Sequence, residues 1–497
     1  MDMNVTYVAA APGEGRIGIV HLGLGAFHRA HQTVYLERHR RRTGDTAWGV
    51  SSANLRSSVG LVDDLREAGY RYPVVEYADS EHATLREIGV IEETHFTGQD
   101  KSSGRDGDGH WGRDLDALLA RLASPEVRIV TLAVTEKGYF LSPAGGELLL
   151  GDPMIAADIA DPSRPRTAPG LLVEALSRRR ERGVAPFTVL SCDNMPDNGK
   201  RTRIAVIQLA RRRDAALARW IATEVAFPCS MVDRIVPAMT AADFSRLADL
   251  GIQNPCAVVC EAFSQWVVED DFPLGRPDWE AEGVEMVADV APFETMKLRM
   301  LNGSHSLLAY LGALAGIETV FEAVRRDDLR ALLRRYMLEE AAPTLSLPEG
   351  MDLVAYAESL LTRFANDSLR HRLQQIAMDG SQKLPQRWLL GAQACVEIGR
   401  PVPCTALGVA AWIRYTAGHD LRGLPYPIDD PLTGRFAGLH DRYGRDPEAL
   451  VDAFLVMDDV VPPALAADAG FTAAVLAAYR HLTQYGPDGA IDVCLQT

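Results

Sequence analysis

The stretch RIGIVHLGLGAFHRAHQTVYLERH, Arg16–His39, decides the expected fold. An apolar run of strand type, Arg16–Leu22, leads into Gly23-Leu-Gly25, and an amphipathic helical pattern follows. Glycines at such a turn let the backbone approach a pyrophosphate at the start of the helix. His28 replaces the third glycine of the dinucleotide-binding fingerprint, and Gly-x-Gly also closes ordinary turns. The candidate cofactor contacts here are Gly23, Gly25, Ala26 and Phe27.

Strand-like and helix-like stretches alternate after this motif. Further strands are predicted at Ala47–Ser52, Arg128–Thr135, Phe187–Cys192, Ala226–Val232 and Cys256–Cys260, with helices such as Leu115–Leu122 and Gly170–Arg182. This alternation predicts a parallel sheet covered by helices. A polar segment, Gln99–Arg113, is expected to be an exposed excursion.

From about Pro292 onward, long helical periodicities dominate. Helices are predicted at Phe293–Leu314, Asp328–Glu340, Leu353–Phe364, Leu369–Met378 and Ala406–Tyr415. The expected fold class is therefore an α/β Rossmann-type N-terminal domain over residues 1–290 and a mainly α-helical C-terminal domain over residues 291–497.

Composition narrows the function classes. The chain has 497 residues, a formal net charge of −16 and 24% charged residues, and no basic stripe offsets the acidic excess. These features argue against nucleic acid as a partner. No apolar run is long enough to cross a bilayer, no signal-peptide pattern is evident, and the odd, scattered set of 7 cysteines suits a reducing compartment. We expect a cytoplasmic protein without a membrane partner.

Polar residues follow several predicted strands, and ligands of open parallel sheets bind beyond the carboxyl ends of the strands. The candidate cofactor-site residues at these ends are Asn54, Thr135, Glu136 and Asn194. The second predicted strand is followed by Asn54 and Arg56 rather than by an acid for the ribose hydroxyls. The residues alone therefore leave the choice between NAD and NADP open.

Lysine is scarce in this chain. Of the 51 basic residues only five are lysines, which suggests that a surviving lysine is needed for its ability to lose a proton. Counted at 100° per residue of an α-helix, Glu294, Asn302 and His305 share a stripe with Lys297. Such a polar stripe is costly to bury unless its groups serve one another or a ligand.

This constellation suits alcohol oxidation by hydride transfer, which needs a base for the hydroxyl proton and donors for the oxygen. Lys297, with a pKa lowered by desolvation, would be the base, and the carboxamides of Asn302 and Asn194 would be the donors. His305 could orient a substrate hydroxyl. The zinc-site, nucleophilic-serine and phosphate-loop motifs are missing from the sequence, so no metal is expected.

The sequence also resembles the polyol-specific long-chain dehydrogenase/reductase family, the mannitol dehydrogenase family, over nearly its whole length. The matching segments are HLGLGAFHRAHQ (21–32), VTEKGY (134–139), SCDNMPDNG (191–199), FPCSMVDRIVP (227–237), GRPDWEAEGVEMVADV (275–290), KLRMLNGSHS (297–306) and MDGSQKLPQR (378–387). The Lys-x4-Asn-x2-His pattern is highly specific to that family.

The resemblance implies roles for matching positions and an active site between the two domains. Lys297 is implied as the general base, Asn194 and Asn302 as the oxyanion-stabilising pair, and His305 as a substrate ligand. Glu294 matches an acid associated with proton passage to solvent. Asp233 and Lys383 match substrate-site positions. The family also implies NAD rather than NADP, and a monomer rather than an oligomer.

Within the family, the chain is most similar to the fructuronate reductase (D-mannonate oxidoreductase) branch. It has Gln375 where mannitol 2-dehydrogenases typically have an arginine, and it reads LPQR at 384–387. Arg372, Lys383 or Arg387 could bind a sugar-acid carboxylate. The expected reaction converts D-fructuronate and NADH to D-mannonate and NAD. The alternatives are oxidation of a neutral polyol such as mannitol or arabinitol, and a nucleotide-binding protein without turnover.

Overall fold

The computed structural model describes residues 3–99, 111–142, 146–348, 350–368 and 371–497. The chain forms two compact units, Met1–Ala291 and Pro292–Thr497. Most of the segment expected to be an exposed excursion, Gln99–Arg113, lies outside the described residues.

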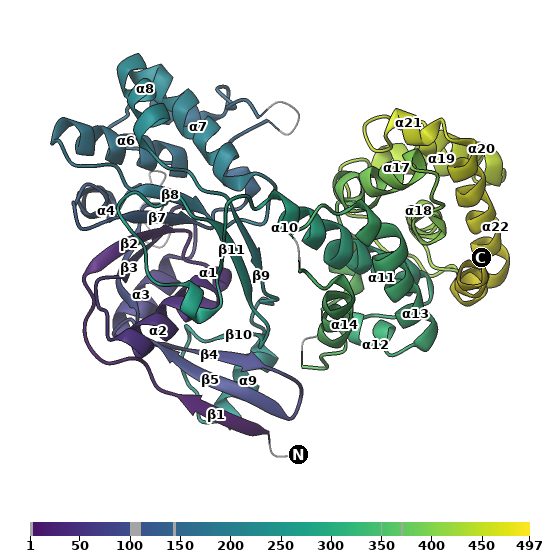
Figure 1. Cartoon of the computed structure of the whole chain (residues 1–497), viewed down its shortest axis with the longest axis horizontal. Helices are drawn as coiled ribbons and strands as arrows, with labels where there is room; N and C mark the ends of the chain where they lie inside the picture. Colours follow the sequence, from purple (N-terminus) through teal and green to yellow (C-terminus); the bar gives the residue numbers. More distant parts are fainter. Residues whose placement is uncertain (1–2, 100–110, 143–145, 349, 369–370) are drawn as a thin grey trace, which may run out of the picture. The chain divides into compact units, whose positions relative to one another are not determined.

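A five-stranded parallel sheet is the centre of the first unit (Figure 1). Its strands, in spatial order, are β6 (Ile91–Phe96), β3 (Gly49–Asn54), β2 (Ile17–Leu22), β7 (Ile129–Leu132) and β8 (Thr188–Ser191). From β2 the chain proceeds to β3 on one side and later to β7 on the other. This reversal creates a topological switch point at the carboxyl ends of β2 and β7, which is where ligands of such sheets bind.

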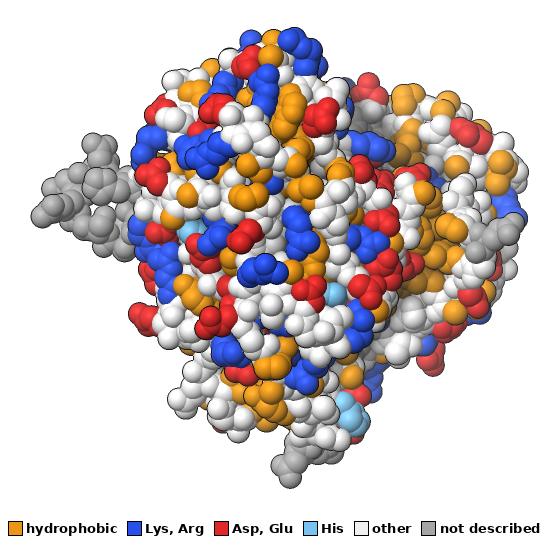
Figure 2. Space-filling view, turned by 60° about the vertical axis from the view of Figure 1, so that its left-hand side comes forward, with side chains coloured by type: hydrophobic (Ala, Val, Ile, Leu, Met, Phe, Trp, Pro, Cys, Tyr) orange, Lys and Arg blue, Asp and Glu red, His pale blue; other side chains and the backbone are white. Residues whose placement is uncertain are grey.

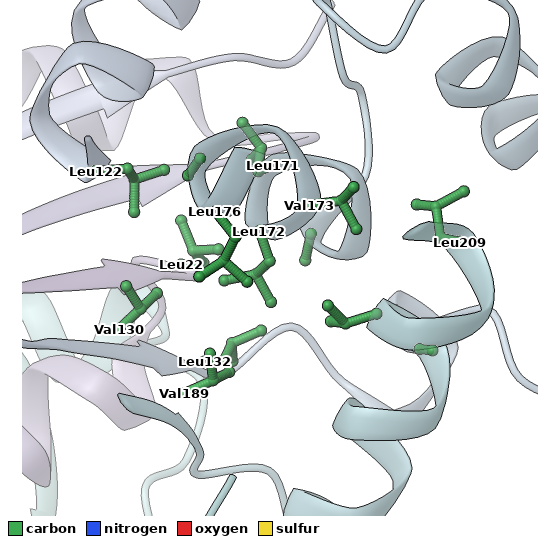
Figure 3. Packing of buried hydrophobic residues seen from close by; sticks show 14 of the residues in the cluster. Leu22, Leu122, Val130, Leu132, Leu171, Leu172, Val173, Leu176, Val189 and Leu209 are labelled. Carbon is green, nitrogen blue, oxygen red and sulfur yellow. The ribbon is translucent and has the colours of Figure 1, made fainter. Parts of the chain in front are cut away.

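Helices cover the sheet because successive strand residues point to opposite faces. Val20 and Leu22 of β2 lie in one apolar cluster with residues of α4 (Leu115–Leu122) and α6 (Ala168–Glu181), and Figure 3 shows Leu122, Leu171 and Leu176 around Leu22. Ile19 of β2 belongs to a second cluster, which includes residues of α2 and α3. The helices of this unit are α1 (Ala26–Ala30), α2 (Gln32–Thr43), α3 (Val59–Glu67), α4 (Leu115–Leu122), α5 (Pro153–Ala160), α6 (Ala168–Glu181), α7 (Asn198–Arg213), α8 (Ala215–Glu224) and α9 (Ala241–Asp249).

Two smaller mixed sheets complete the first unit. One has the order β1 (Asn4–Val8), β5 (His82–Ile88), β4 (Tyr72–Tyr77), β10 (Val258–Glu261), and the other β12 (Glu285–Val287), β11 (Gln265–Glu269), β9 (Ser230–Asp233). The strands predicted at Ala226–Val232 and Cys256–Cys260 therefore exist, as β9 and β10, but outside the main sheet. The difference arises from antiparallel neighbours, β11 beside β9 and β5 beside β4, that the sequence analysis did not predict.

The second unit is helical, which confirms the predicted fold class. Its helices are α10 (Ala291–Met296, which begins at the unit boundary), α11 (Gly303–Leu314), α12 (Val320–Val324), α13 (Asp327–Arg335), α14 (Leu353–Phe364), α15 (Leu373–Ala377), α16 (Gly380–Leu384), α17 (Leu390–Glu397), α18 (Pro403–Tyr415), α19 (Thr433–Tyr443), α20 (Pro447–Leu455), α21 (Pro463–Ala466) and α22 (Ala469–Gln496, interrupted at Gly486). The described residues of this unit also form π-helical turns at Lys297–Asn302, Tyr336–Ala341 and Pro385–Leu389.

The surface mixes charges of both signs. On the face in Figure 2, Lys and Arg side chains lie interspersed with Asp and Glu. Many are paired, as Arg276 is with Asp270 and Glu280. Across the described ranges, no helix combines the length and the apolar character that a membrane span requires.

Candidate active site

The glycine turn lies at the switch point of the parallel sheet. Gly23 follows β2 with a φ of +110°, a conformation that side chains with a Cβ rarely adopt. A Cβ there would lie 2.1 Å from the carbonyl oxygen of Ala133, directly after β7. Both the dihedral angle and the close approach therefore require glycine at position 23.

Gly25 and the start of α1 form an open cradle. Gly25 is the N-cap of α1, and its amide donates to the Gly23 carbonyl at 2.7 Å. A Cβ at Gly25 would lie 3.8 Å from the Gly23 carbonyl oxygen, an ordinary van der Waals contact, so the surrounding protein leaves room beside this residue. Ala26 and Phe27 begin the helix, and amides of a first helical turn have no partner within the helix. Such a cradle fits the pyrophosphate of a dinucleotide.

The end of β3 carries no carboxylate for a ribose. Asn54, the last residue of the strand, donates from Nδ2 to the Ser58 carbonyl at 3.4 Å. Arg56 lies with its guanidinium carbon 5.6 Å from the centre of the Phe140 ring. This geometry leaves the preference for a 2′-hydroxyl or a 2′-phosphate open.

Asp193 joins the ends of β7 and β8, and sequence reasoning did not select it as a site residue. Its carboxylate accepts hydrogen bonds from the amides of Val134 and Thr135, at 3.0 and 2.8 Å, and from the Tyr139 hydroxyl at 2.5 Å. Thr135 has a φ of +66° and precedes Glu136, which pairs with Arg201. Asp193 thus shapes the turn that holds two predicted site residues. Its place after a predicted strand, next to Asn194, was the available signal.

The other two predicted residues of this unit lie at strand ends. Asn194 follows Asp193 and is exposed, whereas Asp233 ends β9 and is buried. The next residue, Arg234, is fully buried and donates to Glu76 at 2.6 Å and to the Glu261 carbonyl at 3.0 Å. This anchored arginine fixes the backbone next to Asp233.

In the helical unit, Lys297, Asn302 and His305 are buried on one continuous helical run, α10, the π turn at Lys297–Asn302 and α11. The π turn corrects one assumption of the sequence analysis, because the stripe was counted on α-helical geometry. π-Helical hydrogen bonds join residues five apart rather than four, so side chains in this turn are spaced differently from those of an α-helix. Such turns occur frequently at functional sites. Glu294 lies one turn earlier, in α10.

His305 is neutral and lies near several basic side chains. Burial lowers its pKa well below the usual value, and His371, Arg387, Arg363 and Lys297 lower it further through their charges. Its ring lies 4.6 Å from that of Phe364 and 5.4 Å from that of His371. Its Nε2 is buried and has no hydrogen-bond partner among the described residues. A ligand hydroxyl would satisfy this nitrogen.

The basic residues considered for a carboxylate differ in placement. Arg387 is half-buried, and its Nη1 donates to neutral acceptors, Ser306 Oγ at 2.9 Å and the Asn302 carbonyl at 3.4 Å. Lys383 is half-buried and donates to the Met378 carbonyl at 2.5 Å. Arg372 is exposed and precedes α15. Arg387 therefore stands against the run that carries Lys297, Asn302 and His305.

The described part of the chain contains no cluster of side chains that could bind a metal ion. Within those residues, no three or more His, Cys, Asp and Glu side chains come together as metal ligands would.

The similarity of this chain to known proteins extends over both units. The mannitol dehydrogenase Rossmann domain model matches residues 17–281, and the mannitol dehydrogenase C-terminal domain model matches residues 289–483. D-Mannonate oxidoreductase of Escherichia coli (strain K12) is 46% identical over 472 residues, 94% of this chain and 93% of that protein. Mannitol 2-dehydrogenase of Emericella nidulans is 36% identical over 453 residues, 89% of this chain and 87% of that protein.

A solved structure agrees with these relatives. Pseudomonas fluorescens mannitol 2-dehydrogenase, in a ternary complex with NAD and D-mannitol, has a TM-score of 0.83 and 36% identity, and the match covers 99% of this chain and 97% of that one. The fold of both units agrees with this similarity. The chain belongs to the mannitol dehydrogenase family and is an oxidoreductase of the dehydrogenase type.

Proposed function

We propose that the protein is an NAD-dependent oxidoreductase that interconverts D-fructuronate and D-mannonate. The proposal rests first on the relative named D-mannonate oxidoreductase, which is more similar in sequence than the mannitol 2-dehydrogenases, at 46% against 36% identity. The proposed substrate carries a carboxylate, which a neutral polyol lacks, and this group needs a binding partner.

The placement of Arg387 supports this choice of substrate, because its guanidinium donates to the Asn302 carbonyl and to Ser306, the residue after His305. Arg387, Arg363 and Lys297 lie near enough for their charges to lower the pKa of His305. Burial also lowers the pKa of the Arg387 guanidinium, so this charge lies in a poorly hydrated place. A carboxylate would stabilise such a charge, and arginine binds carboxylates through paired hydrogen bonds. A neutral polyol would leave it uncompensated.

NAD is the proposed cofactor, bound by the domain that residues 1–290 form. The open cradle at Gly25 and the switch-point position of the turn support it, as does the related mannitol 2-dehydrogenase solved with NAD. The proposed contacts are Gly23, Gly25, Ala26, Phe27, Asn54, Thr135, Glu136 and Asn194.

Catalysis is assigned mainly to the domain that residues 291–497 form. When bound, NADH supplies the hydride to the keto carbon of the substrate. Lys297 delivers the proton to the oxygen as general acid, and takes it back as general base in the reverse direction. The carboxamides of Asn302 and Asn194 stabilise the developing negative charge on that oxygen.

The remaining assignments concern substrate orientation and proton exchange. His305 contacts a substrate hydroxyl through its buried ring nitrogen, and Glu294 passes the lysine proton to solvent. Asp233, Arg372 and Lys383 are the further substrate-binding candidates, with Arg387 as the side chain we favour for the carboxylate.

An assay of NADH oxidation with D-fructuronate and with D-fructose tests the proposal directly. We expect turnover with D-fructuronate and a far lower kcat/KM with D-fructose. The same assay with NADPH should give little turnover. Preference for D-fructose would instead establish a mannitol 2-dehydrogenase or a related polyol dehydrogenase. NADH binding without oxidation by any keto sugar would indicate a nucleotide-binding protein without turnover.

We further propose that the enzyme acts as a monomer in the cytoplasm on a small-molecule substrate. The 7 cysteines are buried free thiols, as suits a reducing compartment. Light scattering coupled to size exclusion tests the assembly state, since a dimer would double the 54.2 kDa mass of one chain.

A further inference from the structure

Two imidazole rings lie directly behind the glycine turn. His21 of β2 and His28 of α1 stack with their centres 3.4 Å apart and their planes 5° from parallel. His28 occupies the position of the third fingerprint glycine, whose usual role is to let the helix pack closely on the strand. Here a flat ring-on-ring contact joins helix and strand instead.

The hydrogen bonds of His21 determine its tautomer. Its Nε2 lies 2.9 Å from the Gly23 carbonyl, which can only accept, so Nε2 carries the proton. Its Nδ1 then accepts from the Thr131 hydroxyl, 2.8 Å away on the neighbouring strand. Thr131 and Ser52 are the residues that pair with His21 in β7 and β3. The ring is therefore fully bonded in its neutral form.

His28 is fixed in the same way by a chain of polar groups. The Gln32 amide nitrogen donates to His31 Nδ1 at 3.1 Å, which turns the Gln32 oxygen toward His28 Nδ1 at 3.3 Å. His28 Nδ1 thus donates, and its Nε2 accepts from the Ser52 hydroxyl at 3.2 Å. His31 Nε2 in turn donates to the Gln265 carbonyl at 3.0 Å.

Both rings are held without charge. Burial lowers the pKa of His21 to about 3 and that of His28 well below the usual value. The charge of Arg29 lowers the pKa of His28 further. Each ring nitrogen has one partner that suits the neutral tautomer, so the hydrogen bonds hold both rings in place.

The pair of histidines contacts the glycine turn at a single carbonyl, that of Gly23. The Gly23 carbonyl accepts from His21 Nε2 and also from the Gly25 amide, at 2.9 and 2.7 Å. These two donors fix the peptide plane between Gly23 and Leu24, and so the direction in which Gly25 enters α1. Loss of the His21 donor would leave the left-handed Gly23 free to rotate, because glycine has many accessible conformations.

We propose that His21 and His28 are positioning residues for the cofactor: together they hold the Gly23 carbonyl so that Gly25 and the start of α1 meet the pyrophosphate. The proposal rests on the proposed binding of NAD. In the common fingerprint the third glycine lets the helix pack on the strand, and here the two stacked histidines make that contact. They also fix the orientation of the Gly23 carbonyl in the turn.

Substitution of His21 by leucine and by glutamine tests the role of the donor. H21L removes the hydrogen bond to Gly23 at similar volume, whereas the side-chain nitrogen of H21Q can replace Nε2. We expect H21L to weaken NADH binding about tenfold, measured by fluorescence titration, and H21Q to restore it to within about threefold of the wild type. At saturating NADH, kcat should change by less than about twofold in either variant. A folded H21L protein with wild-type NADH affinity would overturn the proposal.

Two neighbouring serines provide a second test if H21L does not fold. Ser52 donates to His28, whereas the buried hydroxyl of Ser51 has no hydrogen-bond partner among the described residues. S52A should weaken NADH binding about threefold, and S51A should leave it unchanged. Equal affinities of S52A and S51A would reject the role of His28. Failure of the wild type itself to bind NADH would instead reject the proposed function.

Discussion

The Tyr336 hydroxyl donates to the carbonyl oxygen of Arg299 at 2.7 Å, in the π turn that begins with Lys297. The same hydroxyl lies 3.1 Å from the Arg387 carbonyl, in another π turn. A Cβ at Gly303 would come within 2.1 Å of Tyr336 Oη, so glycine makes room for the phenol. One side chain therefore holds the two turns that carry Lys297 and Arg387.

Replacement of Tyr336 by phenylalanine should reduce kcat while it leaves the affinity for NADH unchanged. The variant loses the hydroxyl that lies between the Arg299 and Arg387 carbonyls, and a small displacement of a general acid slows proton transfer. We expect kcat to fall about tenfold and the free energy of unfolding to fall by about 1–2 kcal/mol. Y485F, at an exposed tyrosine of the same unit, is the matched control. An unchanged kcat in Y336F would show that the turns keep their shape without this hydroxyl.

Lys297 should be indispensable for turnover. K297A removes the proposed proton donor, and loss of a general acid typically costs about 10²- to 10⁴-fold in rate. The affinity for NADH should stay within about twofold of the wild type, because the glycine turn belongs to the other unit. K200A, at an exposed lysine paired with Asp197, should have wild-type kinetics. Wild-type turnover of K297A would eliminate the lysine mechanism.

Strong local patterns allowed several elements to be predicted from the sequence. The helices Leu115–Leu122 and Leu353–Phe364 have the bounds that their apolar periodicity predicted, and the strand before Gly23 differs by one residue. The buried Lys-Asn-His run was found because lysine is rare here and because its spacing resembles a known motif. In each case the signal lies within about 20 consecutive residues.

Other features depend on partners that are distant in the sequence. The π turn at Lys297–Asn302 is completed by Tyr336, which is 37 positions from Arg299. The stack of His21 on His28 is fixed by hydroxyls of neighbouring strands, which no local pattern identifies. The predicted strand β10 pairs with β4, which in turn pairs antiparallel with β5, so β10 belongs to a smaller sheet and not to the main one. Tertiary contacts decide these features, so local propensity could not.

Arg387 should distinguish the acid substrate from its neutral analogue. R387L removes the guanidinium beside Ser306, and loss of a charged hydrogen bond to a carboxylate costs about 2–3 kcal/mol. The kcat/KM for D-fructuronate should therefore fall about 30- to 150-fold, whereas any activity with D-fructose should change far less.

R372L is the control variant for R387L. Arg372 is another basic residue considered for the carboxylate, but it is exposed. R372L should lose less kcat/KM with D-fructuronate than R387L does, because an exposed arginine contacts a ligand in a better hydrated place. A larger loss in R372L than in R387L would move the carboxylate contact to Arg372. Equal losses with both substrates in R387L would assign this arginine to the support of Asn302 and Ser306 rather than to specificity.

The two glycines of the turn should respond differently to alanine. G25A adds a Cβ to open space, so the protein should keep its stability but lose affinity for NADH by about tenfold or more. G23A places a Cβ against the Ala133 carbonyl at a positive φ, so it should lower the free energy of unfolding by at least about 2 kcal/mol. Urea unfolding and NADH titration of both variants separate the effects. Tight NADH binding by G25A would place the pyrophosphate elsewhere.

Stability should fall as the pH is lowered from 6.5 toward 4, partly because of His21. Its folded pKa is about 3, below the value of about 6.5 in the unfolded chain, so the unfolded state binds more protons in this range. The contribution of His21 is fully present above pH 6.5 and is lost as the pH falls toward 3. Between pH 6.5 and pH 5 one such histidine accounts for about 2 kcal/mol.

Urea unfolding at pH 7 and pH 5 measures this linkage in the wild type, in H21Q and in H82Q. His82 is exposed and pairs with Asp79, so its replacement should leave the loss of stability between the two pH values nearly unchanged. H21Q removes the buried imidazole, and its loss between pH 7 and pH 5 should therefore be about 2 kcal/mol smaller than that of the wild type. If H21Q and the wild type lost equal stability, His21 would titrate normally in the folded protein, and the neutral stacked pair behind the glycine turn would be disproved.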